Sequence, residues 1–325
     1  MIKVGIVGSA GYTGGELIRL LVHHPEVSLV FAQSKSNAGR KISSIHQDLF
    51  GSCDLTFSED IQLDVDVIFL CTNHGESRNV LSEMNLPDGI KIIDLSNDFR
   101  LKSACTFGNR NFVYGFPEIN RDIIKNAFSV ANPGCFATAL QLGILPLLKH
   151  GHDNDFYATG ITGSTGAGQS LSSTSHFSWR TNNIQPYKTL SHQHLDEINQ
   201  TVHQIGRKET CPSIHFVPWR GDFARGILMS IQSQSQYSLE ALYDIYFDYY
   251  KDEPFTFVST EMIHLKQVVN TNKCLMHIEK VGDQIAIHTV IDNLLKGAVG
   301  QAVQNMNLMF DLNEKTGLSL KASAF

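Results

Sequence analysis

A turn with three glycines follows the first apolar run of the chain and limits what the N-terminal half can fold into. The run IKVGIVG (2–8) ends at Gly8, and Gly11 and Gly14 come directly before or within the helical pattern of 12–24. Glycines in such a strand-to-helix turn let the backbone approach a pyrophosphate, which the N–H groups of the helix N-terminus bind. The spacing is GxxGxxG rather than GxGxxG, so a tight turn without a ligand remains the alternative.

Further apolar runs continue this strand pattern as far as residue 134. They lie at 26–34, 64–72, 90–96 and 127–134, with helical or polar segments between them. Apolar strands separated by helices are typical of a parallel sheet that is covered on both faces. The sequence therefore predicts a Rossmann-type domain at the start of an α/β protein.

The pattern changes after residue 134. The segments 225–236 and 284–292 alternate apolar and polar residues, as strands do when one face is buried, and 238–252 has the spacing of an amphipathic helix. This pattern predicts an α+β domain with a mixed or antiparallel sheet. The helical segment 295–310 is expected to pack back on the first domain. We therefore expect a first domain of residues 1–134 with 295–325, and a second of residues 135–294.

Composition excludes several classes of protein. The net charge of -6 gives no reason to expect nucleic acid or an anionic membrane as a partner. No apolar run reaches the ~18 residues that a membrane span needs, and the N-terminus lacks the pattern of a signal peptide. The six cysteines contain no CxxC pair, which favours reduced thiols. We expect a cytoplasmic protein.

The end of the second apolar run indicates which dinucleotide binds. NAD-binding chains usually carry an acidic residue there for the ribose 2′-hydroxyl, whereas this chain has Ser34, Lys35 and Ser36. Hydroxyl donors and a positive charge suit a 2′-phosphate, so NADP is the expected cofactor; a solvated basic loop is the alternative. The expected cofactor-binding residues are Gly8, Ser9, Gly11, Tyr12, Thr13, Gly14, Ser34, Lys35, Ser36 and Asn293.

Cys135 is the cysteine with the most suggestive neighbours. It follows Asn132, Pro133 and Gly134 and begins a long apolar segment with helical character. A cysteine in the first turn of a helix meets backbone N–H groups that stabilise a thiolate and lower the thiol pKa. A buried structural cysteine is the alternative. Its position after the last strand of the predicted parallel sheet, where ligands bind, favours a nucleophile.

The segment SHQHLDEI offers a base for this nucleophile. If a helix begins near Ser191, His194 and Glu197 lie one turn apart, and the carboxylate then fixes the imidazole tautomer. His192 points elsewhere in that arrangement and is expected to meet the substrate. Two other interpretations remain: a solvated helix start, and a zinc site, for which no further ligand is evident. We expect no metal.

Arginines after two predicted strands are candidates for binding an anion. Arg100 follows the fourth strand of the parallel sheet, and Arg220 and Arg225 lie in the segment HFVPWRGDFARGI. Guanidinium groups bind phosphate or carboxylate in bidentate fashion, and a surface ion pair is the alternative for each. Arg100 and Arg225 are the predicted substrate-binding arginines. The glycine-rich loop 163–170 either lines the nicotinamide or simply turns the chain.

Seven motifs occur in the order of a known family: GSAGYTGGEL, IDLSNDFRL, YGFPEINR, ANPGCFATA, SHQHLDEI, HFVPWRGDFARGI and DNLLKGAVGQAVQNMNLMF. The chain closely resembles the N-acetyl-gamma-glutamyl-phosphate reductases of the semialdehyde dehydrogenase group, from residue 2 to about 318. The resemblance implies a catalytic domain of the semialdehyde and glyceraldehyde-phosphate dehydrogenase type. It also implies that Cys135 is the nucleophile, that the SHQH segment supplies the base, and that the second domain's sheet builds a homodimer or homotetramer.

The chain departs from the family pattern at a few positions. Phe136 and Ala137 stand where the family usually has Tyr and Pro, and Gln193 replaces the arginine between the two histidines. Gln169 replaces an arginine in the glycine-rich loop, which also has one inserted residue.

The resulting functional hypothesis is NADPH-dependent reduction of N-acetyl-gamma-glutamyl phosphate to the semialdehyde through a thioester on Cys135, in arginine biosynthesis. His194 is the expected proton donor and acceptor. Alternatives are the same chemistry on N-succinylglutamyl, carrier-bound aminoadipyl or aspartyl phosphate, a nucleotide sensor without chemistry, and a metallohydrolase built on the two histidines.

Overall fold

The computed structural model describes residues 1–206 and 211–323, and these form two compact units. The first unit comprises Met1–Pro133 and Ala298–Ser319, and the second comprises Gly134–Gly297 and the segment from Leu320. The first boundary falls after residue 133, where residue 134 was expected, and the second after 297, where 294 was expected. Cys135 is therefore the second residue of the second unit.

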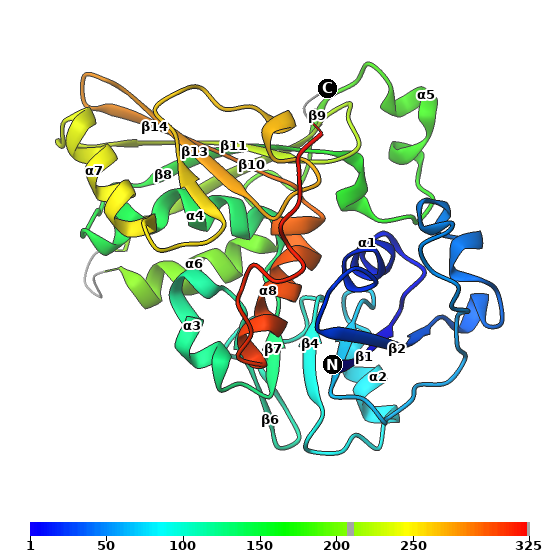
Figure 1. The fold of residues 1–325 in the computed structure, drawn as a ribbon. Helices are drawn as coiled ribbons and strands as arrows, with labels where there is room; N and C mark the ends of the chain where they lie inside the picture. The colour runs from blue at the N-terminus through cyan, green and yellow to red at the C-terminus, as the bar shows by residue number, and fades with distance from the viewer. Residues whose placement is uncertain (207–210, 324–325) are drawn as a thin grey trace. The chain divides into compact units, whose positions relative to one another are not determined.

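The first unit is built on a seven-stranded sheet (Figure 1). Its order is β2-β1-β3-β4-β7-β6-β5, and all neighbours are parallel except β5, which pairs antiparallel with β6. The order reverses between β1 and β3, which makes the turn after β1 the switch point where such sheets bind ligands. The strands are β1 Ile2–Val7, β2 Val27–Gln33, β3 Val67–Leu70, β4 Lys91–Asp94, β5 Thr106–Phe107, β6 Arg110–Tyr114 and β7 Ser129–Ala131.

Helices cover this sheet, and one of them comes from the far end of the sequence. In α8, Asn305 Nδ2 donates to Gly115 O at 2.9 Å and to Asn132 Oδ1 at 3.1 Å. These bonds attach the late helix to the loops that follow β6 and β7, as expected from its sequence. The helices of this unit are α1 Tyr12–Leu21, α2 Ser77–Glu83, α3 Pro117–Lys125 and α8 Gly300–Met309.

The second unit also contains a seven-stranded sheet, but a mixed one. Its order is β12-β13-β14-β11-β8-β10-β9, with parallel pairs at β12–β13 and β8–β10 and antiparallel pairs elsewhere. The expected polar alternation is present in β11, where every second residue from Ile227 to Ser233 is buried. The strands are β8 Phe156–Thr162, β9 Gln185–Pro186, β10 Ile214–Arg220, β11 Ile227–Gln234, β12 Thr256–Val258, β13 Cys274–Val281 and β14 Gln284–Ile291.

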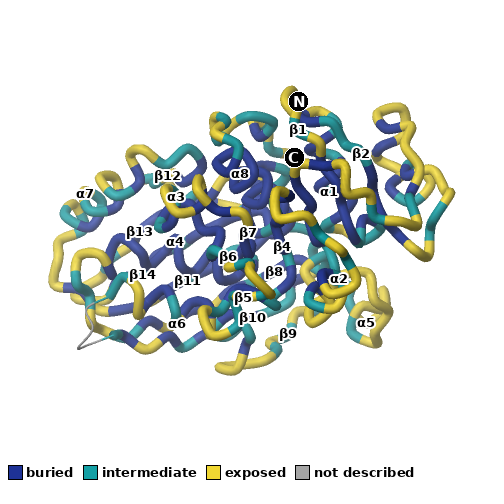
Figure 2. The backbone as a smooth tube through the Cα atoms, turned by 90° about the horizontal axis from the view of Figure 1, so that it is seen from below, coloured by how far each residue is buried: buried dark blue, intermediate teal, exposed yellow. Residues whose placement is uncertain are grey.

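One long apolar helix, α4, forms the centre of this unit. It packs on β11 and β14, and α6 and α7 lie beside it. All residues from Phe136 to Leu148 are buried, so the whole helix is core rather than an amphipathic surface helix (Figure 2). The helices are α4 Cys135–Lys149, α5 Phe177–Arg180, α6 His194–Ile205 and α7 Leu239–Tyr250. Short 3₁₀ turns occur at Lys35–Asn37, Ile42–Ser44, Gln47–Leu49, Ser164–Ala167, Ser173–Ser175 and Leu265–Gln267.

The predicted fold class is confirmed, and two element boundaries differ for clear reasons. The helix expected over 12–24 ends at Leu21, because Pro25 disfavours helical conformation in the residue before it. The helix expected over 295–310 starts as a π-helical turn, Leu295–Val299, before α8. There Gly297 N donates to Asp292 O at 2.9 Å, a five-residue separation. Such turns are frequent at functional sites.

Candidate active site

Cys135 is the first residue of α4 and is half-buried. Gly134 is the N-cap, in extended conformation, and no side chain caps the helix start. Cys135 therefore lies at the N-terminus of α4, where free backbone N–H groups favour a negative charge. The predicted placement of Cys135 at a helix N-terminus is what the structure shows; its role as nucleophile stays a prediction at this point.

Two residues of α6 lie against this helix start. Glu197 Oε2 accepts a hydrogen bond from Gly134 N at 3.1 Å, and Glu197 is 3% exposed. A Cβ atom added to Gly134 would lie 2.3 Å from His194 Nε2, so the imidazole packs directly on the residue before Cys135. α6 begins at His194 rather than near Ser191, which keeps His194 and Glu197 one turn apart.

The distance between His194 Nε2 and Glu197 Oε1 is 3.9 Å. This is an ion-pair distance rather than that of a hydrogen bond. The carboxylate also holds the backbone of Gly134, so Glu197 joins α6 to α4 as well as facing the imidazole. The roles of His194 as base and Glu197 as its partner remain predictions.

His192 lies in an aromatic pocket next to His194. Its ring centroid is 4.6 Å from that of His194, 5.6 Å from Phe136 and 5.7 Å from Tyr187. Its Nδ1 accepts a hydrogen bond from His194 N at 3.2 Å. Burial, and then the charge of Lys188, lowers the pKa of His192 to about 4. The ring is therefore neutral at pH 7 and keeps its proton on Nε2.

This lowered pKa predicts an acid sensitivity. The native state excludes a proton that the unfolded state binds, so the contribution of His192 to stability is present above pH ~6.5 and is lost as the pH falls toward 4. We expect the free energy of unfolding of the wild type to drop by about 2 kcal/mol more than that of His192→Asn over this range. Urea titrations at several pH values measure the free energy of unfolding. The same dependence of this free energy on pH in the two proteins would contradict the prediction.

Sequence reasoning missed Tyr187, which also belongs to this cluster. Burial raises the pKa of its phenol, the negative charge of an ionised Cys135 raises it further, and Arg220 lowers it. The Arg220 guanidinium lies 4.8 Å from the Tyr187 ring centroid. Nothing in the spacing of Tyr187 relative to Cys135 marks it, because only the fold brings the short strand β9 beside β10.

Arg225 and Asn293 belong to a hydrogen-bonded network in the second unit. Arg225 donates to both carboxylate oxygens of Asp292, at 3.1 and 3.2 Å, and Asp292 is fully buried. Asn293 Oδ1 accepts from Gly226 N at 2.7 Å, and its Nδ2 donates to Thr165 Oγ1 at 3.0 Å. The network holds the glycine-rich loop. The substrate role of Arg225 and the cofactor role of Asn293 stay predictions.

The π-helical turn brings Gly297 against Cys135. A Cβ atom on Gly297 would lie 2.7 Å from Cys135 Cβ. Only glycine permits this approach without displacing Cys135. This contact was not predicted, because a π turn has no clear sequence signature.

The glycine turn of the first unit has the geometry of a phosphate-binding loop. Gly8 has φ +77°, and a Cβ atom there would lie 2.7 Å from Cys71 O. A Cβ on Gly14 would lie 2.3 Å from Ser9 O, whereas Gly11, the N-cap of α1, has open space beside it. No side chain caps α1. The first-turn N–H groups of Tyr12, Thr13 and Gly14 therefore fit a pyrophosphate.

The other predicted cofactor residues differ in accessibility. Ser9 is fully buried and its hydroxyl donates to Gln33 O at 2.9 Å. Ser34 is buried and accepts from Asn37 Nδ2 at 3.2 Å. Lys35 and Ser36 are exposed in the 3₁₀ turn after β2, and Lys35 Nζ lies 3.8 Å from Glu83 Oε2 at the surface. Ser9 and Ser34 thus shape the loop, and Lys35 and Ser36 are accessible to a ligand.

Arg100 is 5% exposed in the first unit. Its Nε donates to Asn132 O at 2.8 Å and its Nη2 to Leu95 O at 3.0 Å. The two carbonyls belong to the residues that follow β7 and β4. The guanidinium therefore joins the carboxyl ends of these two strands, and Asn132 lies two residues before Gly134 in the chain. This structural role competes with the predicted phosphate contact, which stays untested.

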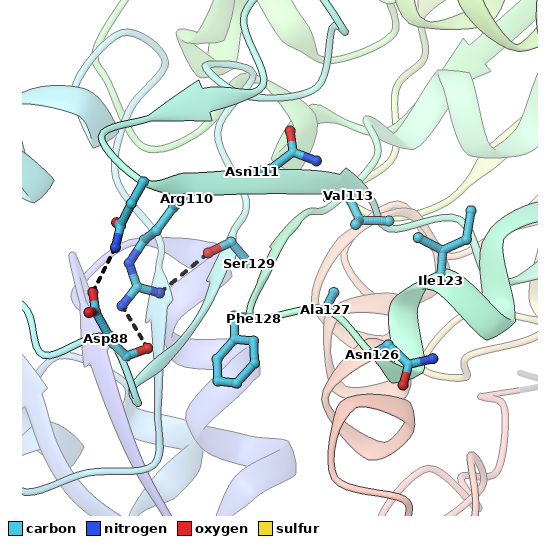
Figure 3. Close-up of a pocket in the computed structure, with 10 residues that line it drawn as sticks. Asp88, Arg110, Asn111, Val113, Ile123, Asn126, Ala127, Phe128 and Ser129 are labelled. Carbon is cyan, nitrogen blue, oxygen red and sulfur yellow. Dashed lines mark hydrogen bonds between the residues drawn. The ribbon is translucent and has the colours of Figure 1, made fainter.

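A separate cavity of about 570 Å³ lies in the first unit beside β6 and β7. Arg110 lines it and donates to Ser129 Oγ and to Asp88 O, both at 3.4 Å (Figure 3). None of its lining residues is a predicted site residue. Within residues 1–206 and 211–323, no group of three potential metal ligands occurs, and no helix is long and apolar enough to cross a membrane.

Comparison with known proteins agrees with this geometry. Residues 3–127 match the NAD binding domain of semialdehyde dehydrogenases, and residues 135–293 match their dimerisation domain. N-acetyl-gamma-glutamyl-phosphate reductases of Christiangramia forsetii and Bacteroides fragilis are 52% identical to the chain, over the full length of both sequences.

Solved structures with a similar fold are more distant in sequence. Aspartate semialdehyde dehydrogenase II of Vibrio cholerae has a TM-score of 0.71 at 15% identity and covers 96% of this chain, with 98% of its own chain matched. The Candida albicans enzyme, solved with NADP, has a TM-score of 0.68 at 14% identity, with 95% and 98% covered. The chain thus belongs to the N-acetyl-gamma-glutamyl-phosphate reductases, within the semialdehyde dehydrogenase family.

Proposed function

We propose that this chain uses NADPH to reduce N-acetyl-gamma-glutamyl phosphate to N-acetylglutamate semialdehyde, in arginine biosynthesis. The observation that carries the proposal is the placement of Cys135 at the uncapped start of α4, with the His194 imidazole packed on Gly134 beside it. A thiolate, a base and a set of backbone N–H donors are the groups that acyl transfer requires.

The reaction divides into two half-reactions on one sulfur atom. His194 accepts the Cys135 thiol proton, and the thiolate attacks the acyl phosphate carbonyl carbon. The C–O bond to phosphate breaks, the leaving phosphate takes the proton from His194, and a thioester remains on Cys135. The N–H groups at the start of α4 stabilise the oxyanion that forms during attack.

A nicotinamide cofactor, when bound, would supply the hydride for the thioester carbon. The oxyanion of the resulting thiohemiacetal re-forms a carbonyl, and the C–S bond breaks to release the semialdehyde and the Cys135 thiolate. His194 then returns a proton from solvent to the sulfur. One proton is consumed in total, and it leaves with the phosphate. The neutral His192, beside His194, contributes shape and an Nε2–H donor rather than charge.

A phosphate-dependent assay in the reverse direction tests this function. Purified protein is incubated with N-acetylglutamate semialdehyde, NADP and inorganic phosphate, and NADPH formation is followed. We expect turnover that requires phosphate. The N-succinyl semialdehyde, aspartate semialdehyde and the carrier-bound aminoadipyl semialdehyde are assayed in parallel; turnover of one of these alone would replace the substrate, and no turnover of any would sink the function.

The choice of NADP over NAD rests in this proposal on Lys35 and Ser36, the accessible donors after β2. We expect Lys35→Met to raise KM for NADPH about tenfold and to leave KM for NADH unchanged, because only NADPH presents a 2′-phosphate. Lys125→Met, an exposed lysine in α3, is the matched control. An equal change in both KM values would contradict the assignment.

The proposal includes a homo-oligomer formed through the second unit. The face of its sheet away from α4 presents Tyr157, 55% exposed, within a groove of about 300 Å³ whose other residues include Thr159, Val217 and Gln232. The match to a dimerisation domain supports self-association there. We expect light scattering to show a dimer or tetramer, and Thr159→Arg to shift the equilibrium toward monomer.

The proposal also places the protein in the cytoplasm, supported by six cysteines that form no disulfide.

A further inference from the structure

Two arginines of the second unit meet next to Tyr187. Arg220, the last residue of β10, pairs across the strands with Gln185 of β9 and places its guanidinium over the Tyr187 ring. Arg180, the last residue of α5, donates through Nη2 to the carbonyl of Gly221, the residue after Arg220. The two guanidinium groups are thus attached to consecutive residues of the same loop.

Neither charge is balanced by an ion pair in the part of the chain that the structure describes. The Nε atoms of Arg180 and Arg220 are both buried and have no hydrogen-bond acceptor among residues 1–206 and 211–323. The nearby Asp222 is exposed, and its carboxylate accepts from Asn182 N at 2.6 Å. Burial, and then the charge of Arg220, lowers the pKa of Arg180, and the charge of Asp222 only partly opposes this. A pair of like charges with buried donors is costly unless an anion joins it.

The pair is also close to the nucleophile. Tyr187, which lies under Arg220, is near enough to Cys135 for an ionised thiol to raise its pKa. Its ring is 5.7 Å from His192, and the His192 ring is 4.6 Å from His194. A continuous series of contacts therefore runs from the Arg220 guanidinium through the Tyr187 and His192 rings to the His194 imidazole beside Gly134.

We propose that Arg180 and Arg220 form an oxyanion-binding site for one of the two anionic groups of the substrate. This inference rests on the proposed function, in which the substrate carries a phosphate and a carboxylate. Each Nε–H, together with the neighbouring Nη–H, presents two donors in the fork that matches an oxyanion. The Tyr187 ring lies against the Arg220 guanidinium and holds it by a cation–π contact. Arg180 and Arg220 are then binding residues that orient the carbonyl toward Cys135.

Kinetics in the reverse direction separate the two sources of the anion, because phosphate and semialdehyde are then different reactants. In both Arg180→Gln and Arg220→Gln, we expect KM for either phosphate or the semialdehyde to rise about tenfold, while KM for NADP stays constant. A change confined to phosphate assigns the site to the leaving group, and a change confined to the semialdehyde assigns it to the carboxylate. Unchanged KM values for both reactants would overturn the proposal. Arg19→Gln, at an arginine already paired with Glu16, is the control.

A second measurement does not depend on the proposed reaction. The rate of Cys135 alkylation is compared for iodoacetate, which is anionic, and iodoacetamide, which is neutral and of similar size. We expect the rate with iodoacetate, divided by the rate with iodoacetamide, to fall about fivefold in Arg180→Gln. This ratio should recover partly in Arg180→Lys, which keeps the charge. A purely structural role would slow or accelerate both reagents equally and would overturn the proposal. Because alkylation needs no substrate, this result stands even if the reductase assay fails.

Discussion

Replacing Cys135 with serine is expected to abolish reduction of the acyl phosphate, with kcat lower by about 10⁴-fold or more. The hydroxyl has the right position at the start of α4 but a far higher pKa than a thiol, so the helix N-terminus cannot hold it as an anion. An ester on serine is also a poorer hydride acceptor than a thioester. Steady-state NADPH consumption measures the loss, and mass spectrometry of the wild type under turnover without NADPH should place the acyl adduct on Cys135.

A matched cysteine serves as the control for this substitution. Cys105 Sγ donates to Lys102 O at 3.3 Å and lies 3.2 Å from Asn111 Oδ1, contacts that a serine hydroxyl can reproduce. Cys105→Ser should therefore keep wild-type activity and melting temperature. Cys71 is not a competing nucleophile, because burial and the charge of Asp94 raise its pKa. An acyl adduct on any residue other than Cys135, or retained activity in Cys135→Ser, would remove the proposed mechanism.

The sequence predicted best those features that depend on local pattern. The position of Cys135 at a helix start follows from Gly134 and the apolar segment after it, and the one-turn spacing of His194 and Glu197 follows from helical geometry alone. The parallel sheet follows from the periodicity of its strands. In each case the residues that carry the signal are neighbours in the chain, so no knowledge of tertiary contacts was needed.

What the sequence could not predict depends on contacts between distant segments. The Nε of Arg100, a predicted phosphate ligand, donates to the carbonyl of Asn132, 32 residues away. Arg225, the other predicted substrate-binding arginine, pairs with Asp292, which lies 67 residues further on. The sequence shows neither partner, and both substrate roles stay predictions. Conversely, Arg180 gave no signal, because its relation to Arg220 exists only once β9 pairs with β10. Guanidinium partners are set by the fold, and a list of arginines does not reveal them.

Substituting Gly134 with alanine is expected to lower kcat by about 10²-fold or more while the protein remains folded. The backbone of Gly134 has φ −74° and ψ 152°, which alanine adopts without strain, so the cost is purely one of space. The added Cβ would lie 2.3 Å from His194 Nε2, so the ring must leave its position against Gly134 to relieve the overlap. The hydrogen bond from Gly134 N to Glu197 resists such a shift, because it ties the same backbone to α6.

Gly89→Ala, where an added Cβ meets nothing within 4 Å, is the control for kcat and melting temperature. A kcat within twofold of the wild type for Gly134→Ala would mean that the imidazole need not stay where it packs, and would remove His194 as the base.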